Sequence, residues 1–242
     1  MLFILLPSVL VTSFLSGVFG MAGGMVLMGI LLVLFSVEKA MFVHGVAQLA
    51  SNGWRAVLWW RYISWRVFRG YALGAALVLA LATMLQVTLS RPVVMLLLGM
   101  TPFVAFLLPS QLQLNVERKG HPFTCGWTCM AMQMFSGVSG PLLDTFFVRS
   151  TMDRRQVVST KAAVQSLSHA LRIAFFGSML AAGDQPISQN DAVLVVVCAI
   201  SGTSASKLML DRINDVDFRF ITQRVVLVLG ACYCAAGGWL LF

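Results

Sequence analysis

Charged side chains are scarce in this chain, and acidic ones especially so. Only 11% of the 242 residues are charged and nine are acidic, whereas 59% are hydrophobic and the mean hydropathy is +0.86. A soluble domain carries about 25% charged residues, and one hydrophobic core cannot bury this apolar excess. Segments 67–89, 92–108, 188–208 and 220–242 hold almost no charge and are long enough to cross a bilayer. The composition therefore predicts an all-α integral membrane protein.

Motifs for catalysis and metal binding are also missing. No HExxH, GxSxG or paired-carboxylate arrangement supports an enzyme, so we expect no catalytic residue. No nucleotide-binding motif occurs either, and we expect no cofactor. Cys125 and Cys129 lie one helical turn apart, but no His or acidic residue completes a metal set, so we expect buried thiols and no metal. Whether these two thiols contact a substrate stays open.

The net charge of +8 does not indicate nucleic acid binding, because Lys and Arg of membrane proteins gather in cytoplasmic loops. The first apolar segment, residues 1–15, lacks the positively charged start of a signal peptide. A counterpart of this segment exists deeper in the chain. We therefore expect it to belong to the mature structure.

Two stretches about 120 residues apart resemble each other. The first is Ser16-Gly17-Val18-Phe19-Gly20-Met21 and the second is Ser136-Gly137-Val138-Ser139-Gly140-Pro141. Each leads, through an apolar run and a charged turn, into a segment with polar residues spaced i, i+4, i+7, i+8 and i+11. The first polar stripe consists of His44, Gln48, Ser51, Asn52 and Arg55, and the second polar stripe of Lys161, Gln165, Ser168, His169 and Arg172.

Each polar stripe occupies one face of a helix, because at about 100° per residue its positions span an arc of roughly 100°. Polar side chains on a membrane helix do not face lipid; they face a cavity, a partner helix or each other. Hydrogen bonding that only holds the bundle together is the alternative interpretation. The ionisable groups in both stripes favour a site for a substrate or for protons.

The apolar segments divide into two repeats. We expect a first repeat over 1–110, with a hairpin at 2–35 and membrane spans at 40–60, 67–89 and 92–108, followed by a cytoplasmic linker at 111–121. The second repeat, 122–242, has a hairpin at 123–148 and spans at 156–181, 188–208 and 220–242. If each glycine-broken hairpin returns to its own side of the membrane, the repeats are inverted. If each hairpin crosses instead, there are eight spans and the repeats are parallel.

The distribution of positive charge distinguishes these arrangements, because basic residues concentrate on the cytoplasmic side. With re-entrant hairpins, eleven basic residues share one side: Arg61, Arg66, Arg69, Arg118, Lys119, Arg149, Arg154, Arg155, Lys207, Arg212 and Arg219. The other side has only two, and carries Lys39, Arg91, Glu38, Asp184 and Asp191. Eight spans would divide the basic residues 8 to 5. Inverted repeats with both termini outside the cytoplasm are therefore favoured.

Secondary transporters with inverted repeats place their sites where broken helices of the two halves meet. A broken helix offers unpaired N–H groups and the positive end of its dipole, and both suit an anion. We therefore expect the two hairpin tips and the polar stripes to bind a small anion. The candidate binding residues are Gln48, Asn52, Arg55, Lys161, Gln165, His169, Arg172, Gly20, Gly23, Gly24, Ser139 and Gly140.

Three titratable residues are candidates for proton coupling, namely His44, His169 and Asp144. A neutral, hydrogen-bonded His169 is the alternative for that residue. Lys161 could attract the anion or pair with Asp144. A central Arg172 costs roughly 2.5–3.5 kcal/mol to insert, which a bound anion or Asp144 would offset, whereas Arg55 is close enough to the cytoplasmic end to snorkel.

The stretch Ser136-Gly137-Val138-Ser139-Gly140-Pro141-Leu142-Leu143-Asp144, followed by Thr160-Lys161-Ala162, Gln165 and His169, resembles the TauE/SafE family of sulfite-exporter-type permeases. The two-half layout and the length are similar as well, over essentially the whole chain. The first half departs from the family pattern, because no proline follows Gly20, Gly23 and Gly24. The resemblance implies transport of sulfite, thiosulfate, a sulfonate or a carboxylate through a multi-pass protein of the bacterial inner membrane. It leaves a homodimer open.

An aromatic cluster, Trp54, Trp59, Trp60, Tyr62 and Trp65, lies beside Arg61 and Arg66. Such clusters are typical of the membrane interface, so the lipid bilayer is the expected partner there. Three functions compete at this point. We favour a secondary transporter driven by protons or by the anion gradient; the alternatives are a non-transporting membrane scaffold and, with less support, a membrane-embedded enzyme.

Overall fold

In the computed structural model, the described residues 1–19, 21–86, 88–181, 187–210 and 215–241 fold into helices without a strand. Gly20, Asp184 and Arg212 lie outside these ranges. The α-helices are α1 (Leu2–Phe19), α2 (Met21–Leu34), α3 (Val37–Leu58), α4 (Trp65–Leu85), α5 (Arg91–Leu107), α6 (His121–Ser136), α7 (Gly140–Phe147), α8 (Arg154–Ala181), α9 (Gln189–Leu210) and α10 (Asp215–Trp239). Two short 3-10 helices are η1 (Trp60–Tyr62) and η2 (Ser110–Leu112).

The break between α6 and α7 follows from the local sequence. Gly137 has a φ of 79°, a left-handed conformation that ends α6 at low cost for glycine. The Ser136 hydroxyl lies within hydrogen-bonding distance of the carbonyls of Met132 and Val138, and so links the last turn of α6 to the backbone beyond the break. Pro141 then lies in the first turn of α7, where its missing N–H costs nothing. A helix pair thus replaces one continuous helix.

The corresponding helices α1 and α2 pack against each other, and α1 is helical as far as Phe19, the counterpart of Ser139. Gly23 of α2 lies so close to Thr12 and Ser16 of α1 that a Cβ would overlap their backbone. The two breaks meet in the interior, because Gly140 at the start of α7 packs against Met21 at the start of α2. Glycine is required at both contacts, and the breaks of the two halves become neighbours.

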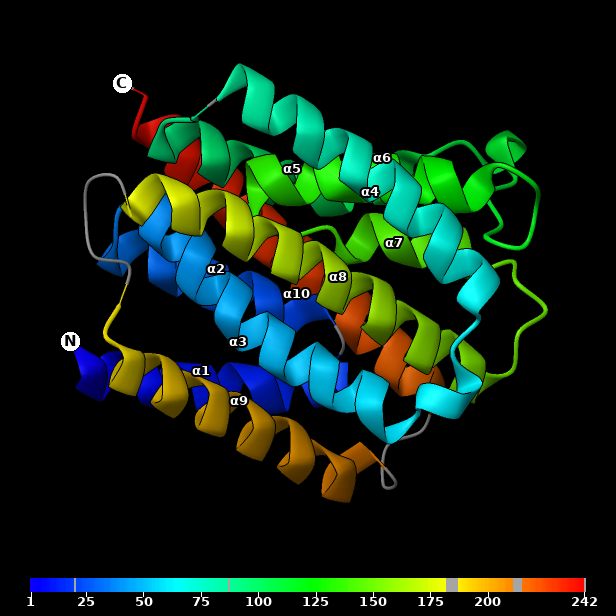
Figure 1. Cartoon of the computed structure of the whole chain (residues 1–242), viewed down its shortest axis with the longest axis horizontal. Helices are drawn as coiled ribbons and strands as arrows, with labels where there is room; N and C mark the ends of the chain where they lie inside the picture. The colour runs from blue at the N-terminus through cyan, green and yellow to red at the C-terminus, as the bar shows by residue number, and fades with distance from the viewer. Residues whose placement is uncertain (20, 87, 182–186, 211–214, 242) are drawn as a thin grey trace.

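The helices associate in pairs that join the two halves (Figure 1). Helix α3 packs along α8 and α5 along α10, and both pairs are antiparallel: Gly45 faces Ile173, whereas Gly53 further along α3 faces Ser166. Helix α1 packs along α9 and α4 along α6, and both pairs are parallel, as Gly70 and Gly74 of α4 face successive turns of α6. When each helix of α1–α5 is exchanged with its equivalent in α6–α10, the same four helix pairs result.

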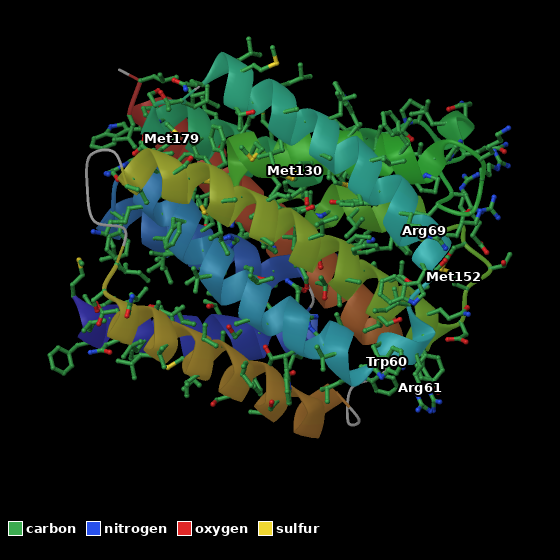
Figure 2. All side chains as sticks on the ribbon, viewed as in Figure 1. Trp60, Arg61, Arg69, Met130, Met152 and Met179 are labelled. Carbon is green, nitrogen blue, oxygen red and sulfur yellow. The ribbon has the colours of Figure 1, made fainter. Side chains whose placement is uncertain are left out.

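Both termini lie at one end of the molecule, on the left in Figure 1. The opposite end carries η1, and Figure 2 shows Trp60, Arg61 and Arg69 gathered there, far from Met179. Arg155 joins this end through a hydrogen bond of 3.1 Å to the Tyr62 hydroxyl and through the faces of Trp59 and Tyr62. Basic and aromatic residues therefore concentrate at the end away from the termini.

Among the described helices, α4 meets both the length and the apolarity of a lone membrane span. Helices α3 and α8 are long enough, but their polar stripes lower their hydropathy. Helices α1, α2 and α5 are apolar but shorter. The count of six full spans thus stays a prediction.

Candidate functional site

A cluster of polar side chains occupies the centre of the molecule, where α3 and α8 cross the hairpin breaks. Arg172 of α8 is completely buried and donates one hydrogen bond to the Gly137 carbonyl and another, 2.6 Å long, to Nδ1 of His44 on α3. We call Arg172, His44, His169, Gln133 and Ser139 the central cluster. It joins both polar stripes to the break between α6 and α7.

The proton positions on His44 follow from its partners. Because the guanidinium can only donate, Nδ1 of His44 accepts from Arg172. The proton of the ring is then on Nε2, which donates to the Gly24 carbonyl of α2 over 2.9 Å. His44 is thus a neutral ring that links Arg172 of one half to the α1–α2 hairpin of the other.

His169 is oriented by a residue that the sequence reasoning missed. Ser139 donates to Oε1 of Gln133 over 2.8 Å, so the Gln133 amide directs its N–H toward Nδ1 of His169 at 3.0 Å. The two imidazole rings meet edge to face, with 5.9 Å between centroids. A lone glutamine inside the apolar segment 123–148, six residues before Ser139, was the available signal.

Two buried hydrogen-bond donors in this region find no acceptor among the described residues. Nε of Arg172 and Nε2 of Gln48 are inaccessible to solvent and make no hydrogen bond. Gln48 lies one turn after His44 on α3 and borders the backbone of Gly24. Because a buried donor without a partner is costly, these groups are suited to an anionic acceptor that fits between the stripes.

The rest of the first stripe forms hydrogen bonds within α3 and to α9. Asn52 donates to the Gln48 carbonyl at 3.0 Å, and Arg55 donates to the Asn52 side chain at 3.0 Å. Ser51 bonds to Thr203 of α9 at 2.7 Å. Among the described residues, the hydrogen bonds of Arg55 therefore all go to its own helix.

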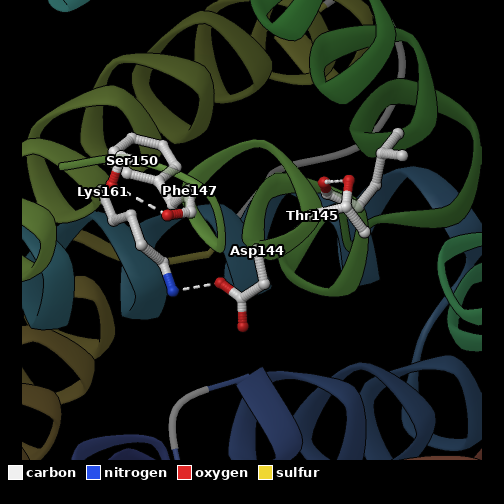
Figure 3. A network of polar contacts seen from close by, with 6 residues as sticks. Asp144, Thr145, Phe147, Ser150 and Lys161 are labelled. Carbon is white, nitrogen blue, oxygen red and sulfur yellow. Dashed lines mark hydrogen bonds and ion pairs between the residues drawn. The ribbon is translucent and has the colours of Figure 1, made fainter. Parts of the chain in front are cut away.

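The second stripe is less fully paired. Ser168 bonds to the Tyr71 hydroxyl of α4 at 2.7 Å and so matches the Ser51–Thr203 contact with the halves exchanged. Gln165 is half-buried and makes no hydrogen bond within the described part of the chain. Lys161 forms an ion pair with Asp144 of α7 (Figure 3). This pair lies apart from the central cluster and is partly open to solvent.

The predicted glycines have different roles. Gly24 supplies the carbonyl that accepts from His44. Gly23 and Gly140 permit close packing in this conformation, against α1 and against Met21. Gly20 lies outside the described residues.

Of the two partners expected for Arg172, Asp144 is wrong and a bound anion stays a prediction. The structure gives Arg172 a neutral histidine and a backbone carbonyl, and Asp144 pairs with Lys161. Both partners of Arg172 are neutral acceptors. The guanidinium charge is therefore stabilised by dipoles and is not neutralised by a carboxylate.

Within the described part of the chain, the stripes face each other without an open cavity. His44, Gln48, Asn52, His169 and Arg172 are at most 5% exposed. A depression of about 10 Å³, room for about one water, opens near Glu38 and Thr88 and has Met41 in its wall. Met41 also touches Gly137, whose carbonyl Arg172 holds. In this conformation the central cluster is closed, and Met41 separates it from the depression.

Cys125 and Cys129 are buried, free thiols 3.9 Å apart. No group of three or more His, Cys, Asp or Glu side chains suited to a metal occurs among the described residues. Both thiols lie on α6, beside Tyr71 of α4 in the packed core.

Comparison with known proteins identifies the family. The sequence model described as "Sulfite exporter TauE/SafE" matches residues 5–233, which is nearly the whole chain. The chain belongs to the TauE/SafE family. No curated protein and no solved structure matches it. Membership in TauE/SafE confirms the resemblance seen in the sequence and makes the chain an integral membrane protein of a transport family rather than of an enzyme family.

Proposed function

We propose that this TauE/SafE protein is a secondary transporter that moves a small organic or sulfur-containing anion across the inner membrane. The observation that carries the proposal is the junction of Arg172 and His44. These residues come from different halves, meet where the two hairpin breaks meet, and are accompanied by the unpaired donors of Arg172 and Gln48. A buried cation beside unpaired N–H groups is a site for an oxyanion.

We further propose that the two halves are inverted repeats. Equivalent helices α3 and α8 run antiparallel, as do α5 and α10, and the helix pairs convert into one another when the halves are exchanged. The basic end opposite the termini supports a cytoplasmic location for η1 and an outer location for both termini. In such transporters the halves rock about a midplane site, so that each side is open in turn.

Separation of the stripes would expose the proposed site. Arg172, Gln48, Gln165, His169 and Asn52 would then face one opening from two antiparallel helices. The anion then takes the place of His44 or the Gly137 carbonyl as acceptor for Arg172. It also accepts from Nε of Arg172 and Nε2 of Gln48, which are unpaired in the closed state. We assign substrate contacts also to Arg55, Lys161, Gly20, Gly23, Gly24, Ser139 and Gly140, and proton coupling to His44, His169 and Asp144.

Uptake of radiolabelled anions by proteoliposomes tests the proposal. Sulfite, thiosulfate, a sulfonate and a carboxylate would be compared for the wild type, Arg172→Ala and Gln165→Ala. We expect at least one anion to be taken up by the wild type and a reduced rate in both variants. Equal rates in all three proteins would remove the support for this site, and absence of uptake of every anion would contradict the function.

A non-transporting membrane scaffold is the second candidate, because the polar residues of the central cluster pack closed against each other. In a scaffold the stripes only join helices. If the protein is a scaffold, replacing Gln48 by leucine would leave the protein folded and would change no anion flux. A transporter loses flux with the same replacement while it remains folded.

A further inference from the structure

The ion pair between Lys161 and Asp144 differs from the contacts of the central cluster, because both of its side chains are partly exposed although the paired oxygen, Oδ1 of Asp144, is buried. The side chains are 27% and 32% exposed, whereas the members of the central cluster are at most 4% exposed. Asp144 Oδ1 accepts no hydrogen bond from another described group. Figure 3 shows the two side chains extending toward each other from α8 and α7. Among the described residues, Lys161 is thus the partner of this oxygen.

The equivalent contact in the first half has a different acceptor. Lys161 begins the second stripe as His44 begins the first, and Asp144 lies four residues after Gly140 as Gly24 lies four residues after Gly20. His44 donates to the backbone carbonyl of Gly24, whereas Lys161 pairs with a side-chain carboxylate. The backbone carbonyl of Gly24 is not protonated and cannot move away from its helix, whereas the Asp144 carboxylate can be protonated and its side chain can rotate. The Lys161–Asp144 contact can therefore be broken and replaced by another anion.

We propose that Asp144 is a tethered anion that competes with the transported anion for Lys161, and that protonation of Asp144 releases Lys161 for the substrate. The inference rests on the proposed transport function and specifies its coupling. Two anions beside one ammonium repel each other, so the carboxylate must take up a proton when the substrate binds. One proton is then carried with each anion, and a monovalent anion moves without net charge.

Several other charged groups on the neighbouring elements have partners of their own; Glu117, in the loop that packs on α7, accepts from the Thr151 hydroxyl at 3.0 Å. His169 and Arg172 are bound within the central cluster, and Arg55 is bound to its own helix. Arg91 of α5 donates to the Phe35 carbonyl, and His121 of α6 accepts from the Asn115 backbone. The residues at the basic end of α4 and α8 are Arg66, Arg69, Arg154 and Arg155. Lys161 is the cation that faces Asp144 among the described residues.

The test compares wild type, Asp144→Asn and Asp153→Asn in proteoliposomes that contain radiolabelled thiosulfate or methanesulfonate, which stay ionised over the pH range used. Asp153 is exposed and accepts from the Gln156 N–H at the start of α8, where asparagine caps a helix as well as aspartate. We expect an inward proton gradient to drive accumulation by the wild type and by Asp153→Asn. Asp144→Asn should continue anion exchange but should not accumulate anion in response to the gradient.

Competition between Asp144 and the transported anion for Lys161 also predicts that Asp144→Asn binds the anion more tightly. At alkaline pH the KM for anion exchange should be roughly fivefold lower in Asp144→Asn than in the wild type, the size of one partly exposed ion pair. Asp144→Glu, which keeps the carboxylate, should accumulate anion with the gradient. Gradient-driven accumulation by Asp144→Asn would overturn the inference, and so would loss of coupling in Asp144→Glu. If the wild type moves neither anion, the proposed function itself fails.

Discussion

Replacement of Arg172 by methionine separates the transport role of this residue from its structural role. Methionine is similar in length and apolar, so it can fill the space between α3 and α8 without carrying a charge. The change removes the hydrogen bonds from the guanidinium to the Gly137 carbonyl and to His44. His44 keeps its bond to the Gly24 carbonyl.

Two opposing contributions to the free energy of unfolding make the effect of Arg172→Met on stability small. Two hydrogen bonds from a charged donor contribute about 3–6 kcal/mol together. Removing a charge from the membrane interior regains roughly 2.5–3.5 kcal/mol. The net loss is therefore about 0–3 kcal/mol, and the Tm in detergent should fall by less than about 12 °C. For transport, loss of the buried cation from an anion site should lower kcat/KM by about 100-fold.

The assay pairs a melting curve of the purified protein with anion uptake in proteoliposomes. Arg61→Met is the matched control, because Arg61 is exposed at the basic end and stacks on Trp60 with 5.6 Å to the ring centroid. We expect the control to melt and transport like the wild type. A folded Arg172→Met protein that transports at the wild-type rate would refute the assignment of Arg172 to the anion site.

Two further substitutions test the packing around the central cluster. Gln133→Leu leaves the Ser139 hydroxyl and Nδ1 of His169 without their partner. It should lower the free energy of unfolding, measured in denaturant, by about 1–3 kcal/mol. An unchanged free energy of unfolding would contradict the hydrogen-bond assignment. Gly126→Ala would place a methyl group on the Tyr71 backbone and should cost about 1–3 kcal/mol, while Gly238→Ala, where the methyl meets open space, should melt like the wild type. Equal melting of the two alanine variants would contradict the close α4–α6 contact.

Helix positions could be predicted from the sequence because apolar runs and glycine breaks mark them directly. Over the segment 123–148, for example, the structure has α6 and α7 with a break at Gly137, while the re-entrant course of this segment stays a prediction. The family could be predicted because the Ser136–Asp144 stretch and the residues from Thr160 to His169 carry its pattern, and the family match confirms it. The helical spacing of the two stripes could be predicted. Seven of their residues are buried, namely His44, Gln48, Ser51, Asn52, Ser168, His169 and Arg172, whereas Arg55, Lys161 and Gln165 are partly exposed.

Apart from Asp144, which was one alternative for Lys161, the partners of the stripe residues could not be predicted, because they depend on how the two halves approach each other. Antiparallel packing of α3 and α8 brings the start of the first stripe to the end of the second, so that His44 meets Arg172. The same packing leaves Arg55 and Lys161 at the other end of the contact. Gln133 was missed because it stands alone in an apolar segment, outside both repeated spacings.

Thiol accessibility of the stripes tests most directly whether they line a path for an anion. Gln48→Cys and Gln165→Cys would be introduced singly after replacement of the five native cysteines, and treated with a negatively charged methanethiosulfonate in membranes. Ala174→Cys, on an exposed position of α8, is the control that faces lipid. We expect both stripe cysteines to react and the transported anion to protect them, while the control stays unmodified. If neither stripe cysteine reacts from either side of the membrane, the stripes only hold helices together, and the transporter account is contradicted.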